Sequence, residues 1–222
     1  MRFKSSAKAY PHAQGTLQDE IVHPAKWCHK LPPNVSLELG ALVEPLSVAL
    51  HASERAGLSP GSTVLVFGAG TVGLLCAAIT KVLVPSSSVV IADIQEDRVK
   101  FAVKNGFADA FVVVPMKRPT TVEDKLAFAK EMAESVKAII LPGEDKPLGE
   151  VSATYECTGG EICLQASIYS TAPGGRIMII GMGTPIQTLP ISAAALREVD
   201  LIGVFRVKDD QGNLVLKVMV NM

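Results

Sequence analysis

The feature that most constrains the fold is a glycine-rich turn between an apolar run and a helix-forming stretch. Val64 to Phe67 form an apolar run typical of a buried strand, and Gly68, Gly70 and Gly73 follow it. After a stretch of helix-forming residues, a second apolar run ends at Asp93, twenty positions beyond the last glycine. This order predicts the strand–turn–helix–strand unit in which the pyrophosphate of a dinucleotide rests on a helix N-terminus.

Each residue of this pattern has an expected task. Gly68 allows the tight turn out of the strand, and Gly70 has no Cβ, so that backbone N–H groups can approach phosphates. Gly73 lets the helix pack closely on the sheet. Asp93 is expected to accept hydrogen bonds from the adenosine ribose and to repel a 2′-phosphate, which favours NAD over NADP. The alternative is a glycine-rich turn in another α/β protein that binds no dinucleotide.

Composition narrows the class of protein. The chain has 222 residues, a formal net charge of -1 and 48% hydrophobic residues, enough for one large α/β domain with an appendage. Near-neutral charge gives no electrostatic case for nucleic acid or an anionic membrane as partner. Neither a membrane span nor a secretory signal is expected, since no long uncharged apolar stretch is present. The scattered cysteines argue against a disulfide framework and a cysteine zinc site, and predict a cytoplasmic setting: Cys28, Cys76, Cys157 and Cys163.

Downstream of residue 60, strand-like and helix-like stretches alternate. The expected strands are Thr63–Phe67, Val89–Asp93, Ala110–Val114, Ala153–Cys157, Arg176–Gly181 and Leu201–Phe205. The expected helices span 71–84, 95–105, 122–138, 160–171 and 191–198. This alternation predicts an α/β fold with a doubly wound, parallel, six-stranded (Rossmann) sheet in the order 3-2-1-4-5-6.

The first sixty residues have a different pattern. Short β-like pieces at 15–22 and 27–32 are too few for an independent core, and Glu44-Pro45-Leu46 opens a helix that runs to about Gly57. A β-rich fragment without a complete core predicts the remnant of a larger domain.

Several blocks resemble the zinc-dependent medium-chain alcohol dehydrogenases, and in particular their polyol branch, the sorbitol and xylitol dehydrogenases. The similarity covers about residues 1 to 206, and its blocks occur in the family's order. They are Gly15-Thr16-Leu17-Gln18, Lys30-Leu31-Pro32, Gly40-Ala41-Leu42-Val43-Glu44-Pro45-Leu46-Ser47-Val48, Gly61-Ser62-Thr63-Val64-Leu65-Val66, Glu156-Cys157-Thr158-Gly159 and Gly203-Val204-Phe205-Arg206.

The resemblance implies a domain division and a chemistry. Residues 1–43 would be a remnant of the GroES-like catalytic domain, 44–206 the dinucleotide-binding domain, and 207–222 a tail unlike the family. The implied reaction is hydride transfer from a secondary alcohol of a polyol to NAD, giving a ketose, with zinc acidifying the hydroxyl. Family dimers pair around the last strand, which implies a homo-oligomer through Leu201–Phe205.

The resemblance also implies site residues. Glu44 would lie beside the catalytic zinc and touch substrate, or instead be an acid favoured at a helix N-terminus by the dipole. Val72 would contact the cofactor, and Arg98 would lie along the adenosine, or instead be a solvated helix residue. The backbone of Ile180, Gly181 and Met182 would face the nicotinamide. Val204, Phe205 and Arg206 would do the same, with Arg206 also reaching the substrate hydroxyls.

The zinc ligands of the family are incomplete in this sequence. The family uses a cysteine and a Gly-His-Glu pair, and no His-Glu dipeptide occurs here, which leaves Glu44 as the one matched metal residue. We therefore expect the chain to begin inside the catalytic domain, as a truncated member. Three functions stay open: a zinc-dependent polyol dehydrogenase, a catalytically inactive NAD-binding module, and a zinc-free quinone or enone reductase. The last fits the Glu44 and Arg206 blocks poorly.

Overall fold

The computed structural model describes residues 19–20, 22, 25, 28–205, 207–208, 214–215 and 218–219. Its helices are α1 (Leu37–Ala41), α2 (Val43–Ala56), α3 (Thr71–Leu83), α4 (Glu96–Lys104), α5 (Val122–Lys137), α6 (Glu161–Ser170) and α7 (Ile191–Ala195). Its strands are β1 (Cys28–His29), β2 (Thr63–Phe67), β3 (Ser88–Asp93), β4 (Ala110–Val113), β5 (Val151–Glu156), β6 (Thr171–Ile179), β7 (Asp200–Gly203), β8 (Val207–Lys208), β9 (Leu214–Val215) and β10 (Val218–Met219).

The chain divides into two units. One comprises Met1–Ala41 and Leu216–Met222, in which β1 pairs with β10, and the other comprises Leu42–Val215. The second unit holds the main sheet, with the strand order β4-β3-β2-β5-β6-β7 and parallel pairing throughout. This is the predicted order 3-2-1-4-5-6, and the α/β Rossmann prediction is confirmed.

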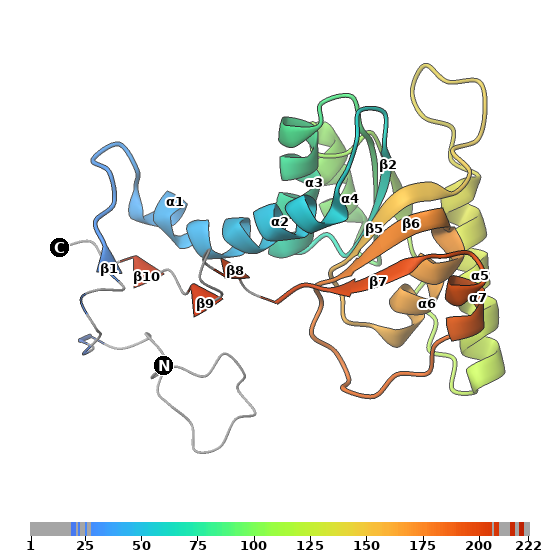
Figure 1. Ribbon diagram of the computed structural model, residues 1–222. Coiled ribbons are helices and arrows are strands. Elements are labelled where there is room, and N and C mark those ends of the chain that lie inside the picture. The colour runs from blue at the N-terminus through green and yellow to red at the C-terminus, as the bar shows by residue number, and fades with distance from the viewer. Residues whose placement is uncertain are drawn as a thin grey trace. The chain divides into compact units, whose positions relative to one another are not determined.

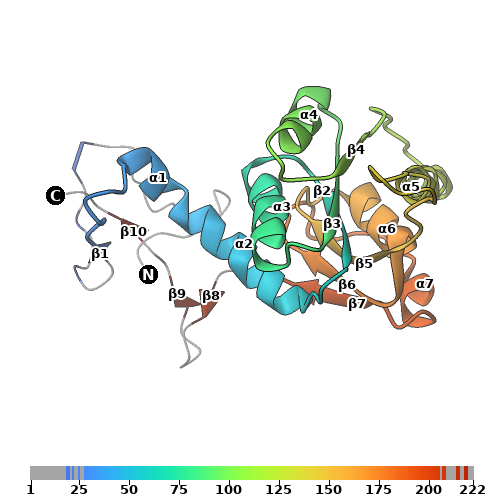
Figure 2. The same ribbon diagram turned by 90° about the horizontal axis from the view of Figure 1, so that it is seen from above.

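Helices cover both faces of the main sheet (Figures 1 and 2). Because side chains alternate along a strand, Val64 and Val66 of β2 pack with α2, α3 and α4, while Leu65 and Phe67 pack with α5 and α6. A strand buried on both faces reads as a continuous apolar run, which explains why β2 was visible in the sequence. Both faces must be covered for the carboxyl ends of the strands to form one well-ordered edge.

Strand β6 differs from the prediction. The sequence predicted a helix over 160–171 and a strand over Arg176–Gly181, but β6 spans Thr171–Ile179. The register against β5 shifts there, from Val151 opposite Thr171 to Ala153 opposite Arg176. Glycine and proline within a strand commonly mark such a bulge.

Among the described residues, no helix is both long and apolar enough to cross a membrane.

Candidate cofactor-binding site

The carboxyl ends of the central strands form one continuous edge. The residue that follows each strand still donates its backbone N–H to the neighbouring strand: Gly68 to Ala92, Cys157 to Phe67, Ile180 to Glu156, and Val204 to Ile179, at 2.8–2.9 Å. Four strand spacings separate β3 from β7, about 19 Å at the usual 4.8 Å each. An extended ligand laid across this edge meets the ends of all five strands from β3 to β7 in turn.

The fold itself requires two of the three glycines of the turn, for different physical reasons. Gly68 has φ +96, in the left-handed region that favours glycine, and a Cβ there would lie 3.0 Å from the Thr158 methyl. A Cβ on Gly73 would overlap the Gly68 carbonyl oxygen, so Gly73 is required for close helix–sheet packing.

Gly70 has no such internal reason. It is the N-cap of α3 with φ -78 and ψ -178, an extended conformation open to any residue, and no atom lies within 4 Å of a Cβ built there. The α3 N-terminus also has no side-chain cap. The space beside Gly70 is therefore free for a ligand that approaches the unpaired N–H groups of α3, and phosphate groups suit a helix N-terminus.

Asp93 stands at the end of β3, half-buried beside the turn. Its Oδ2 accepts from the Ala69 N–H at 2.6 Å and its Oδ1 from the Gln95 N–H at 2.8 Å. Each carboxylate oxygen has a second lone pair, so Asp93 can accept two more hydrogen bonds from ligand hydroxyls. The bond to Ala69 also fixes the turn, so the same carboxylate shapes both parts of the site.

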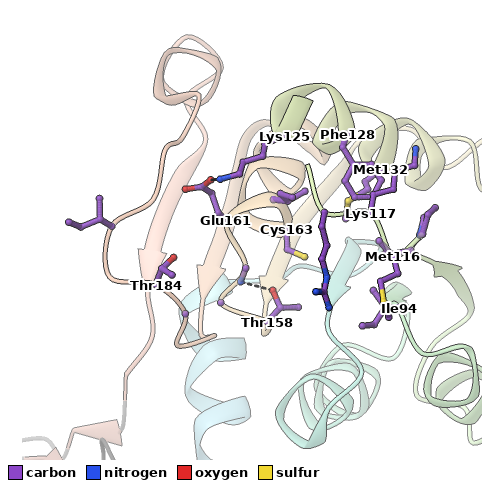
Figure 3. Close-up of a pocket in the computed structure, with 18 residues that line it drawn as sticks. Ile94, Met116, Lys117, Lys125, Phe128, Met132, Thr158, Glu161, Cys163 and Thr184 are labelled. Atoms are coloured by element: carbon purple, nitrogen blue, oxygen red, sulfur yellow. Dashed lines mark hydrogen bonds and ion pairs between the residues drawn. The ribbon is translucent and has the colours of Figure 1, made fainter. Parts of the chain in front are cut away.

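A hollow of about 430 Å³ links the turn to Asp93. It is lined from β2 and its turn by Phe67, Gly68 and Gly70, from β3 onward by Ala92, Asp93, Ile94, Gln95 and Arg98, and elsewhere by Val114, Cys157, Thr158, Gly160 and Cys163. A second hollow of about 790 Å³ continues beyond it (Figure 3). The predicted residues Gly68, Gly70, Asp93 and Arg98 thus meet around one cavity.

The motif Glu156-Cys157-Thr158-Gly159 forms the wall between β2 and β6, a role that the sequence did not reveal. The buried Glu156 carboxylate accepts from the Thr158 N–H at 2.8 Å, from the Gly159 N–H at 3.0 Å, and from the Thr158 hydroxyl. Burial raises the pKa of Glu156, and these hydrogen bonds oppose that rise. A polar residue at the end of a buried strand, followed by two glycines, was the available signal.

Two cysteines line the first hollow. Burial raises the pKa of the Cys163 thiol to about 11, which keeps it protonated and poorly nucleophilic at neutral pH. Cys157 is half-buried and lines the same hollow. Neither cysteine belongs to a metal-binding group among the described residues.

The residues predicted for the nicotinamide side lie at the ends of β6 and β7. Both Ile180 and Gly181 donate backbone N–H groups to the Glu156 carbonyl at 2.9 Å. Met182 is 75% exposed, Val204 is buried, and Phe205 is 56% exposed. Arg206 lies outside the described residues, so its predicted contacts stay predictions.

Three other predicted residues have clear positions. Val72 is half-buried in the first turn of α3 and packs on the core shared with α2 and α4. Arg98 is exposed on α4, and it also lines an outer hollow of about 540 Å³ that includes Gly70. Glu44 is exposed in the first turn of α2, where the helix dipole favours an acid. Its predicted role beside a metal stays a prediction.

Comparison with known proteins gives a consistent result. A sequence profile described as zinc-binding dehydrogenase matches residues 71–221. A sorbitol dehydrogenase of Arabidopsis thaliana is 40% identical over 202 residues, which is 90% of this chain and 50% of that protein. A sorbitol dehydrogenase of Gallus gallus is 38% identical over 200 residues, 89% of this chain and 50% of that protein. The chain spans about half the length of these curated relatives.

Solved structures share the fold. L-idonate 5-dehydrogenase from Escherichia coli superposes with a TM-score of 0.67 at 23% identity, over 92% of this chain and 52% of that one. 2R,3R-butanediol dehydrogenase from Bacillus subtilis gives a TM-score of 0.59 at 27% identity, over 79% of this chain and 44% of that one.

Proposed function

Because the chain belongs to the zinc-binding dehydrogenase family, we propose that it binds NAD along the carboxyl edge of its sheet for the oxidation of a polyol. The product would be a ketose, formed when a secondary alcohol carbon gives its hydride to C4 of the nicotinamide and the hydroxyl loses its proton. The curated relatives named sorbitol dehydrogenase support this substrate class.

The observation that carries the proposal is the unoccupied space beside Gly70 at the N-terminus of α3. The fold does not require a glycine there, because a Cβ would meet nothing and φ is ordinary. Ligand binding would require a glycine at position 70, since any side chain there would lie between the α3 N-terminus and a bound phosphate. The pyrophosphate oxygens of NAD would accept hydrogen bonds from the N–H groups of the first turn of α3, and the helix dipole would stabilise their negative charge.

Asp93 supports NAD over NADP. Its two oxygens accept hydrogen bonds from the N–H groups of Ala69 and Gln95, and each has a second lone pair that can accept from a ribose hydroxyl. A 2′-phosphate in the same position would bring two negative charges together. At the other end of the edge, the backbone from Ile180 to Met182 and the residues Val204 and Phe205 would face the nicotinamide, and Arg206 would reach the polyol hydroxyls.

Zinc is the group that the family leads us to expect for acidifying the alcohol. Among the described residues, no three His, Cys, Asp or Glu side chains gather as a metal site, and Glu44 is an exposed, single carboxylate. Catalytic zinc normally takes three protein ligands. The described residues alone therefore do not fit a zinc ion.

That observation favours a second candidate function, an NAD-binding module without turnover. Within the part of the chain that the structure describes, the edge of β7 that faces away from β6 is not paired with another strand of the main sheet. A second copy of the chain would be the partner expected at such an edge.

Calorimetry separates the candidates. We expect the full chain to bind NAD⁺ more tightly than NADP⁺, with each affinity measured with and without added zinc and alongside a sorbitol turnover assay. Stoichiometric zinc uptake with turnover would support the dehydrogenase. Tight NAD⁺ binding with neither would support the module, and binding of no dinucleotide would overturn the proposal.

A further inference from the structure

The hollow of about 790 Å³ is continuous with the proposed ribose site. It shares Ile94, Val114, Thr158, Gly160 and Cys163 with the smaller hollow that contains Asp93. A ribose held at Asp93 therefore has an opening beside it through which the attached adenine can continue.

The walls of this larger hollow suit a flat, uncharged ring. Phe128 and Met132 of α5 and Ile162 of α6 contribute apolar surface. Figure 3 shows Ile94 and Met116 close together on one side of the hollow and the Lys125–Glu161 pair on another. An apolar cavity with a few polar groups is the usual form of a site for an aromatic base.

The charges around the hollow are paired except for one. The Lys117 ammonium lies 2.7 Å from the Glu131 carboxylate and over the Phe128 ring, and the Lys125 ammonium lies 2.9 Å from Glu161. Arg118 lines the same hollow and has no hydrogen-bond or ion-pair partner within the described part of the chain. Its guanidinium is therefore free to contact a ligand.

We infer that Arg118 stacks its guanidinium on the adenine base of the bound dinucleotide and so sets the affinity of the site for the adenosine half. This inference rests on the proposed function. A planar guanidinium stacks on aromatic faces, whereas an ammonium cannot form the same flat contact. Arg118 comes from the segment between β4 and α5, so adenine recognition would depend on a loop outside the glycine turn.

The test uses three ligands and four variants of the full chain, of which Gly70→Val tests the proposed function itself. NADH and AMP contain adenine, and reduced nicotinamide mononucleotide does not. Arg118→Ala should weaken NADH and AMP by about 5- to 30-fold, the range from an exposed to a desolvated cation–π contact, and leave the mononucleotide unchanged. Arg118→Lys keeps the charge without the plane and should not restore the affinity. Lys146→Ala, which removes an exposed cation that lines none of the three hollows, is the matched control.

The outcomes separate this inference from the function on which it rests. If the wild-type chain binds neither NADH nor AMP, the proposed function fails. If NADH binds and Gly70→Val removes it, but Arg118→Ala changes nothing, only the inference fails. Full recovery by Arg118→Lys would also overturn stacking and leave simple charge attraction, and so would an equal loss for the mononucleotide.

Discussion

Gly70→Ser is expected to separate the stability of the fold from dinucleotide binding, because the two place opposite demands on this position. Gly70 is the N-cap of α3 in an extended conformation, and a Cβ there would meet no atom within 4 Å. Serine is a preferred N-cap residue, since its hydroxyl accepts an N–H of the first helical turn. The free energy of unfolding should therefore stay the same or rise by about 0.3 kcal/mol.

The expected effect on binding has the opposite sign. The serine Cβ and hydroxyl would occupy the space through which phosphate oxygens reach the N–H groups of α3. A hydrogen bond to a charged group contributes about 1.5–3 kcal/mol, so loss of one bond should weaken NAD by about tenfold or more. Gly70→Val, with a branched side chain and no capping hydroxyl, should abolish dinucleotide binding.

Denaturant unfolding and NADH fluorescence titration measure the two quantities on the same samples. Ala138→Ser is the control, because Ala138 is exposed at the C-terminal end of α5 and lines none of the three hollows, and both quantities should stay near wild type. Gly73→Ala is a second control, in which stability and affinity should fall together. The added Cβ would overlap the Gly68 carbonyl oxygen and disturb the packing of α3 on the sheet. Wild-type NAD affinity in Gly70→Ser and Gly70→Val would refute the assignment of the phosphate site.

Three further results are expected. Asp93→Ala should weaken NAD and reduce the discrimination against NADP in parallel titrations, and an unchanged NAD-to-NADP ratio would remove Asp93 from the ribose. Burial raises the pKa of Glu156 above its ordinary 4.5, so the folded state keeps this proton to higher pH than the unfolded state does. The unfolding free energy of wild type minus that of Glu156→Gln should therefore decrease as pH rises from 4.5 through the raised pKa. A value of this difference that does not change with pH in denaturant melts would contradict the prediction. With a pKa of about 11, Cys163 should react with iodoacetamide at a rate that still increases above pH 9, and the reaction should be slower when NADH fills the hollow. Mass spectrometry of the labelled peptide measures this rate. A rate that stops increasing near pH 9 would show that the thiol pKa is not raised.

The sequence predicted the parts of this structure that depend on local pattern. Val64 to Phe67 are apolar because β2 is buried on both faces, and the alternation of strands with helices predicts the parallel sheet and its strand order. Spacing alone could not reveal the role of Glu156, because its hydrogen bonds with Thr158 and Gly159 depend on how the chain turns after β5. Nor could spacing reveal the hollow of about 790 Å³ that Arg118 lines, because its walls come from separate segments that packing brings together.

Charge along the edge of the sheet changes in the order that a dinucleotide would need. Asp93 places a negative charge at the end of β3, where ribose hydroxyls can donate to it. The α3 N-terminus beside Gly70 supplies partial positive charge to a phosphate. Farther along, the Glu156 carboxylate is buried and accepts hydrogen bonds from Thr158 and Gly159, so the edge near Ile180 presents backbone to a flat ring. A ligand with hydroxyls at one end, an anionic centre and a flat ring at the other matches this sequence of environments, whereas a simple anion would use only its middle.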